Sequence, residues 1–273
     1  MTGSLEARLR TRFGGRTVVV TGGSRGIGAA AARMLGAAGA DLVLLARDGA
    51  ALESVAREVR AAGGTASVLP VELRDAVAAA ETGRRIAAEC SPPALVLANA
   101  GHSIHRSAGA SVGRAHDAER TLATSYTGHV ALLLELLPAM RAAGRGRVVA
   151  SSTAALAVPA PGWAAYLAAK AALERWLRDV DAETRPDGVT LGSVRLPLVR
   201  TAMSAPTAAY AEARALTPEA AARMLLRASL GRRRLVQPWW GAAASLTAHL
   251  APGLADGVAR GWERRLAAAG KRG

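Results

Sequence analysis

Short apolar runs alternate with longer, alanine-rich segments along most of the chain. The apolar runs predict strands at residues 17–21, 41–47, 66–71, 94–101, 146–152 and 189–197, with a short seventh at 234–238. Uninterrupted apolar strands that alternate with helices are typical of a parallel sheet covered on both faces. The pattern therefore predicts the α/β class, with a doubly wound, Rossmann-type sheet that binds its ligand at the carboxyl ends of the strands.

Two end segments lie outside this alternation. A short helix is predicted over residues 4–13, and an amphipathic helical tail follows the seventh strand. We expect one domain over residues 1–240 and a C-terminal extension of the same domain over 241–273. Two interpretations of the tail stay open: it packs over the substrate cleft or a neighbouring subunit, or it contacts lipid or a long apolar substrate. Three tryptophans favour an apolar contact of some kind, Trp239, Trp240 and Trp262.

Composition narrows the function class. The 273 residues carry a net charge of +14, and all but two of the 35 basic residues are arginine. The arginines are mostly scattered and aromatic residues are few, which disfavours a nucleic-acid partner. The single cysteine, Cys90, excludes an intrachain disulfide and a cysteine-rich metal site, and no metal is expected. Neither a membrane span nor a signal-peptide core is recognisable, so a cytoplasmic location is expected.

A glycine-rich turn follows the first strand directly. The sequence there is TGGSRGIG, at residues 21–28, and it leads into an alanine-rich helix. Glycine permits the backbone angles of a tight turn and the close approach of a pyrophosphate, while the helix directs free N–H groups at the phosphates. A strand-turn-helix context makes this motif a dinucleotide site. The residues expected to hold the cofactor here are Gly22, Ser24, Arg25, Gly26, Ile27 and Gly28.

The end of the second strand indicates which dinucleotide is bound. Folds that prefer NAD place Asp or Glu at this point, where the acid binds the ribose hydroxyls. Here the strand ends in Ala46-Arg47, and Asp48 comes one position later, where it is expected to cap the next helix. The guanidinium groups of Arg47 and Arg25 suit a 2′-phosphate. NADP(H) is therefore the expected cofactor.

Four motifs in order resemble the short-chain dehydrogenase/reductase family over residues 16–203. They are TGGSRGIG at 21–28, NAG at 99–101, SS at 151–152 and YLAAK at 166–170. The resemblance implies a Rossmann-type oxidoreductase that forms dimers or tetramers. It also implies that Asn99 and Gly101 border the cofactor, and that Pro197, Val199 and Thr201 complete its site.

The spacing of Tyr166 and Lys170 has a chemical reason. Residues four apart share one face of a helix, so the lysine can stand beside the phenol. A neighbouring ammonium and the positive nicotinamide would favour the phenolate and bring its pKa toward the working range. The resemblance implies that Tyr166 transfers the proton and that Lys170 also binds the nicotinamide ribose.

The resemblance also implies that a serine at the end of the fifth strand holds the substrate carbonyl oxygen. We assign Ser152. The loop from Ser152 to Tyr166 is one residue longer than is common in the family, so Ser151 stays open as the alternative. Many members place an asparagine of a proton relay where this chain has Ser125, which offers one hydroxyl in place of an amide and a carbonyl.

Three segments indicate the substrate. AGHSIHRS, DAERTLATSYTG and PLVRTAMSAPT are similar to the reductase domain of bacterial fatty acyl-CoA and fatty aldehyde reductases. The resemblance implies reduction of a carbonyl by NADPH, with either a long apolar acyl or aldehyde substrate or a small ketone. Two alternatives stay open: a non-redox enzyme that uses Tyr166 for proton transfer, and a cofactor-binding regulatory protein.

Overall fold

The computed structural model describes residues 4–205, 207, 210 and 213–251, and the isolated positions 253, 256, 257 and 261. Its centre is a seven-stranded sheet in the order β3-β2-β1-β4-β5-β6-β7, in which every pair of neighbours is parallel. After β3 the chain crosses over to β4 on the other side of β1, so the switch point expected of a Rossmann-type sheet lies between β1 and β4. The strands are β1 (Thr17–Thr21), β2 (Asp41–Ala46), β3 (Thr65–Pro70), β4 (Leu95–Ala98), β5 (Gly146–Thr153), β6 (Val189–Leu196) and β7 (Leu235–Val236).

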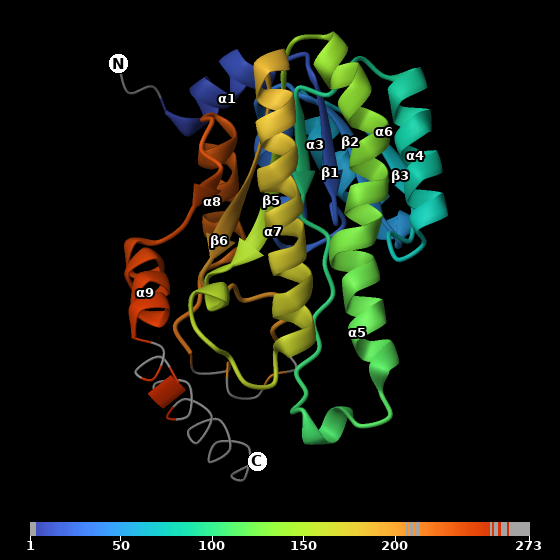
Figure 1. The fold of residues 1–273 in the computed structure, drawn as a ribbon. Helices are drawn as coiled ribbons and strands as arrows, with labels where there is room; N and C mark the ends of the chain where they lie inside the picture. Colours follow the sequence, from blue (N-terminus) through green and yellow to red (C-terminus); the bar gives the residue numbers. More distant parts are fainter. Residues whose placement is uncertain are drawn as a thin grey trace.

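Helices cover both faces of the sheet, as the sequence predicts (Figure 1). One core joins the sheet to α2, α3 and α8, with α1 against α2, and the other joins it to α4, α6 and α7. The helices are α1 (Leu5–Phe13), α2 (Gly26–Ala37), α3 (Gly49–Ala61), α4 (Ala76–Glu89), α5 (Ala115–Leu122), α6 (Gly128–Ala142), α7 (Ala164–Thr184), α8 (Pro218–Ser229) and α9 (Trp239–Leu250).

Side-chain alternation along the strands separates the two cores. On β5, Val149 belongs to the α2/α8 core, whereas Val148 and Ala150 belong to the α6/α7 core. Successive residues of a strand point to opposite faces, so an apolar run without polar interruptions is needed when both faces are covered. This requirement explains why the strand predictions from apolar runs are confirmed for β1 to β6 to within a few residues at their ends.

The end segments differ in how closely they follow prediction. The helix expected at 4–13 is confirmed as α1, with Ser4 as its N-cap and with Leu9 and Phe13 buried. The seventh strand has two residues, and Pro238, which cannot donate a ladder hydrogen bond, is the N-cap of α9.

The tail begins with α9, which leaves several apolar side chains in solvent. Trp239 is 83% exposed and Leu250 is 72% exposed. Trp262 lies outside the described residues. Among the described helices, none combines the length and apolar character that a membrane crossing requires.

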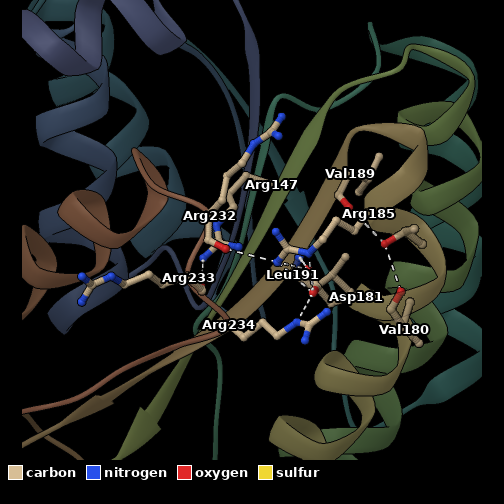
Figure 2. Close-up of polar contacts among 10 residues, drawn as sticks. Arg147, Val180, Asp181, Arg185, Val189, Leu191, Arg232, Arg233 and Arg234 are labelled. Carbon is tan, nitrogen blue, oxygen red and sulfur yellow. Dashed lines mark hydrogen bonds and ion pairs between the residues drawn. The ribbon is translucent and has the colours of Figure 1, made fainter.

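A buried carboxylate binds β6 and the chain that leads into the edge strand β7. Asp181 of α7 is fully buried and accepts hydrogen bonds from the Leu191 amide (2.7 Å), from Arg185 and from Arg234 (Figure 2). Burial alone would raise the pKa of Asp181, but the hydrogen bonds from Arg234, the Leu191 amide and Arg185 outweigh it and lower the pKa. Because β7 pairs only with Ser193 and Val194, Asp181 satisfies an amide of β6 that the ladder leaves free.

Replacing Asp181 by asparagine is expected to destabilise the fold. The change leaves two guanidinium groups without their carboxylate, and the free energy of unfolding should fall by about 3 kcal/mol, the low end for a broken buried pair because Arg234 is half exposed. Urea unfolding at pH 7 measures the difference. The matched control is Asp179→Asn on the same helix, whose ion pair with Arg175 lies in solvent and should matter little. Equal effects of the two substitutions would contradict the role given to Asp181.

Candidate active site

The glycine turn lies between β1 and α2, at the carboxyl end of the central strands. Gly22 and Gly26 have positive φ angles of 66° and 56°, which side chains rarely tolerate. A Cβ at Gly28 would lie 2.2 Å from the Gly22 carbonyl oxygen, so the first turn of α2 closes tightly on the loop. Gly26 also lies near Thr201, whose Cγ2 would be 3.5 Å from a Cβ at that position. The fold thus brings together the turn and the segment after β6.

A hydrogen-bonded hub holds the turn against the end of β4. The Thr21 hydroxyl accepts from the amides of Asn99 (2.9 Å) and Ala100 (3.0 Å), and it lies 3.0 Å from Nε2 of His129. The Asn99 side chain donates to the Thr21 carbonyl at 3.3 Å. Burial and the charge of Lys170 lower the pKa of His129 to about 3, so its imidazole is neutral. Asn99 therefore fastens the end of β4 to the turn.

The two arginines expected at a 2′-phosphate lie on the surface near the turn. Arg25 pairs with Asp48 at 3.4 Å, and Arg47 pairs with Glu72 at 3.4 Å. Asp48 also accepts from the Ala51 amide and caps α3, as predicted. Both guanidinium groups are mostly exposed, so these ion pairs are weak and leave donors for a phosphate.

Tyr166 and Lys170 lie one turn apart on α7. The Lys170 ammonium is buried, 6.0 Å from the centroid of the Tyr166 ring, and it donates to the Ser151 carbonyl at 2.9 Å. Burial lowers the pKa of Lys170 to about 8, against the opposing charge of Glu174. The helix thus places an ammonium, a phenol and the end of β5 together, as the spacing predicts.

The pKa of Tyr166 differs from expectation. The sequence predicts a pKa lowered by Lys170 and the nicotinamide, whereas burial raises the pKa to about 12, the Tyr210 phenol adds to the rise, and a hydrogen bond with Thr153 opposes it. Desolvation of the phenolate is the largest of these contributions. At neutral pH the phenol keeps its proton.

Three consecutive hydroxyl residues end β5, and they have different environments. The Ser151 hydroxyl donates to the Asn99 carbonyl at 3.2 Å, so it serves the junction with β4. The Ser152 hydroxyl is buried and has no hydrogen-bond partner among the described residues. Thr153 contacts the Tyr166 phenol and also accepts from the Ala155 amide at 3.2 Å.

Thr153 is the functional candidate that the sequence reasoning missed. The loop length points to it: counted from Ser152, the loop to Tyr166 is one residue longer than is common in the family, and counted from Thr153 it has the common length. Threonine offers the same hydroxyl donor and acceptor as serine. The choice among adjacent hydroxyls depends on strand geometry, which composition does not reveal.

Ser125 is buried in a π-helical turn (Ala123–Thr127) that joins α5 to α6. Such turns frequently occur at functional sites. The Ser125 hydroxyl accepts from the His102 amide at 3.1 Å. A Cβ at Gly101 would lie 3.3 Å from the Lys170 ammonium and 3.6 Å from the Ser125 hydroxyl, so the glycine keeps space between them. The predicted residues Gly101, Ser125 and Lys170 therefore meet in one place.

The segment after β6 folds back on itself near the glycine turn. The Ser204 hydroxyl donates to the Val199 carbonyl at 2.8 Å and accepts from the Thr201 amide at 3.0 Å. Val199 forms an isolated parallel bridge with Leu216. Pro197, Val199 and Thr201 thus lie in a defined loop at the carboxyl end of β6, where the sequence predicts cofactor contacts.

An aromatic cluster covers Tyr166. Trp163 is stacked on Tyr210 at a centroid distance of 5.9 Å, contacts the edge of the Tyr166 ring at 5.9 Å, and lies 4.9 Å from the His105 ring. These rings come from three segments far apart in sequence. Trp163 packs against the Tyr166 ring, while His105 and Tyr210 pack on Trp163, and burial of the phenol raises its pKa.

Comparisons with known proteins agree with this geometry. The family model described as short chain dehydrogenase matches residues 16–211. The chain is 36% identical to a fatty acyl-CoA reductase of Acinetobacter baylyi over 252 residues, 92% of this chain and 85% of that protein. It is 35% identical to a fatty acyl-CoA reductase of Mycobacterium tuberculosis over 225 residues, 82% of this chain and 76% of the relative.

Solved structures share the fold. A 3-oxoacyl (acyl-carrier-protein) reductase from Agrobacterium tumefaciens with NADP bound has a TM-score of 0.75 and 30% identity, over 84% of this chain and 95% of the other. A metagenomic short-chain oxidoreductase in complex with NADP has a TM-score of 0.72 and 29% identity, over 83% of this chain and 99% of the other. With its parallel sheet, its glycine turn and its Tyr166-Lys170 pair, the chain belongs to the short-chain dehydrogenase family of oxidoreductases.

Proposed function

We propose that the protein uses NADPH to reduce a long-chain carbonyl compound, either a fatty aldehyde to the alcohol or a fatty acyl-CoA to the aldehyde with cleavage of the thioester and release of CoA as the thiol. The observation that carries this proposal is the buried Lys170 ammonium beside Tyr166, at the carboxyl edge where the glycine turn opens. The fatty acyl-CoA reductases that match most of the chain support the substrate class. The NADP-bound structures of similar fold support the cofactor.

The glycine turn fits a dinucleotide. Gly22, Gly26 and Gly28 leave space that a Cβ would fill, so a pyrophosphate can approach the backbone at the start of α2. Arg25 and Arg47 would bind the 2′-phosphate, and Asn99, Gly101, Lys170 and the loop with Pro197, Val199 and Thr201 would border the nicotinamide half. NADPH, when bound, supplies the hydride.

Tyr166 would donate the proton to the carbonyl oxygen as the carbonyl carbon is reduced. A phenol with a pKa of about 12 is protonated at neutral pH, which is the form that a reduction consumes. The phenolate left behind would be stabilised by the Lys170 ammonium on the same face of α7. Ser125, beside Gly101 and Lys170, would hold a water that returns a proton to the phenol.

A hydroxyl at the end of β5 would hold the carbonyl oxygen. The buried Ser152 hydroxyl has no hydrogen-bond partner among the described residues, so it is available to a ligand. Thr153, in contrast, already contacts the Tyr166 phenol. The carbonyl oxygen must lie within hydrogen-bond distance of the phenol that protonates it. We therefore favour Thr153 for this role and keep Ser152 as the competing assignment.

The tail suits an apolar substrate. Arg195 binds Glu174 of α7 at 2.8 Å and Gln237 at 3.2 Å, and these contacts fasten the start of the tail near the active-site helix. The exposed side chains of α9, Trp239 and Leu250 among them, offer a surface for an acyl chain, a lipid headgroup region or a second subunit.

A homodimer or homotetramer in the cytoplasm is the assembly we propose.

Oxidation of NADPH by the purified protein tests the function. Acyl-CoAs and aldehydes of graded chain length should be reduced with kcat/KM that rises with length, because longer chains bury more apolar surface. Tyr166→Phe should lower kcat at least a hundredfold, since it removes the proton donor.

The matched control is Tyr126→Phe, another half-buried tyrosine of the chain, which should keep its activity. NADPH binding without turnover on any of these carbonyl compounds would contradict the reductase function. It would favour the non-redox enzyme or the regulatory protein instead.

The two hydroxyl assignments give opposite results on substitution. If Thr153 holds the carbonyl oxygen, Thr153→Val should lower kcat about a hundredfold, Thr153→Ser should keep most of the activity, and Ser152→Ala should change little. Steady-state kinetics with one aldehyde is sufficient. A large loss in Ser152→Ala with an active Thr153→Val would return the role to Ser152.

A further inference from the structure

A polar cavity lies at the end of the sheet opposite the candidate active site. The catalytic residues follow the carboxyl ends of the strands, whereas this cavity is lined by residues at the amino ends of β5 and β6, at the C-terminal end of α1 and in the chain after α8. Its volume is about 330 Å³, at the small end of the range for ligand pockets. Its wall includes Arg12, Gly146, Arg147, Gly188, Thr190 and Arg232.

Arg147 places a buried positive charge in the wall of this cavity. The side chain is only 2% exposed, and one guanidinium nitrogen, Nη2, donates to the Arg233 carbonyl at 2.7 Å. The other two, Nε and Nη1, have no hydrogen-bond partner among the described residues. Gly192 makes room for the group, since a Cβ there would lie 3.0 Å from Nη2. Burying a guanidinium with unmet donors is costly unless an anion compensates it.

The nearby carboxylates already form ion pairs with other arginines. Asp181 is the acid whose charge acts on Arg147, but its oxygens bind Arg185 and Arg234 (Figure 2). Asp187 precedes Gly188 and pairs with Arg141 at 2.6 Å. Desolvation lowers the pKa of Arg147 to about 10, which still leaves it charged at neutral pH.

Two further cations complete the wall. Arg12 comes from the last turn of α1, and Arg232 comes from the loop between α8 and β7. Both are exposed, and neither has an ion pair within the part of the chain that the structure describes. Three guanidinium groups from three separate elements therefore surround one small cavity without a carboxylate in its wall.

We propose that this cavity is a binding site for a small phosphate-bearing anion, separate from the active site. A phosphate or phosphate ester carries about −1.5 to −2 charges at pH 7, which matches three arginines better than a single carboxylate does. Arginine also binds phosphate oxygens in a bidentate manner. The ligand would compensate the buried charge of Arg147 and bridge α1, β5 and the loop after α8.

Calorimetric titration tests the proposal. The protein is first saturated with NADP⁺, so that the dinucleotide site is filled, and then titrated with inorganic phosphate, pyrophosphate or AMP at low ionic strength. One site per chain is expected for at least one of these probes. Arg12→Gln and Arg232→Gln should each weaken its binding about tenfold, the effect of losing one charge-assisted hydrogen bond, and Arg147→Met should abolish it.

The controls separate a built site from general positive charge. Arg233→Gln removes a charge from the same loop at a residue that is not part of the cavity wall, and it should leave the affinity unchanged. An equal loss in Arg233→Gln would overturn the proposal, as would equally tight binding of succinate or the absence of any binding. Arg12→Gln and Arg232→Gln change exposed side chains, so the test holds even if Arg147→Met does not fold.

Discussion

The buried ammonium of Lys170 sets the geometry of the active site. A charge in this position needs oxygen partners, and the end of β5 provides one through the Ser151 carbonyl. The ammonium lies close to residue 101 in the chain after β4, where a glycine leaves room for it and for the Ser125 hydroxyl. Tyr166 then follows from the helix itself, one turn earlier on the same face of α7. The chain has only one other lysine, far away in sequence at Lys271.

Most of the fold and half of the site follow from local patterns. The apolar runs that predict the strands are forced by a sheet covered on both faces, and the glycines of the turn are forced by a backbone that few other residues adopt. Gly22 is predicted from the strand-turn-helix pattern, whereas Asn99, Tyr166 and Lys170 are predicted from the family motifs, and the four-residue spacing on α7 explains why the last two lie on one face. Local patterns report what the backbone requires.

The remainder depends on contacts between distant segments. Thr153 is distinguished from Ser151 and Ser152 only by what each hydroxyl meets, and the sequence treats the three alike. Burial and the Tyr210 phenol raise the pKa of Tyr166, in the direction opposite to expectation, because Tyr210 approaches Tyr166 only in the folded chain. In the sequence nothing distinguishes Asp181 from the other acidic residues of its helix, because its burial depends on the tertiary fold.

The 21 residues of α7 connect the two ends of the molecule. The N-terminal turns of α7 carry Tyr166 and Lys170. Its C-terminal turns carry Asp181, whose carboxylate binds Arg185 and Arg234 at the opposite end of the helix. The arginines at the two ends of the molecule differ in exposure. Those near the glycine turn have exposed guanidinium groups, whereas the guanidinium group of Arg147 is buried.

Transfer of deuterium from the cofactor tests the central claim most directly. NADPH deuterated at the nicotinamide C4 position is incubated with the protein and a long-chain aldehyde, and the product is analysed by mass spectrometry. The account predicts one deuterium on the carbinol carbon of the alcohol when the label is on the transferred face. Bound NADPH with no deuterium in any product from either labelled face would contradict it.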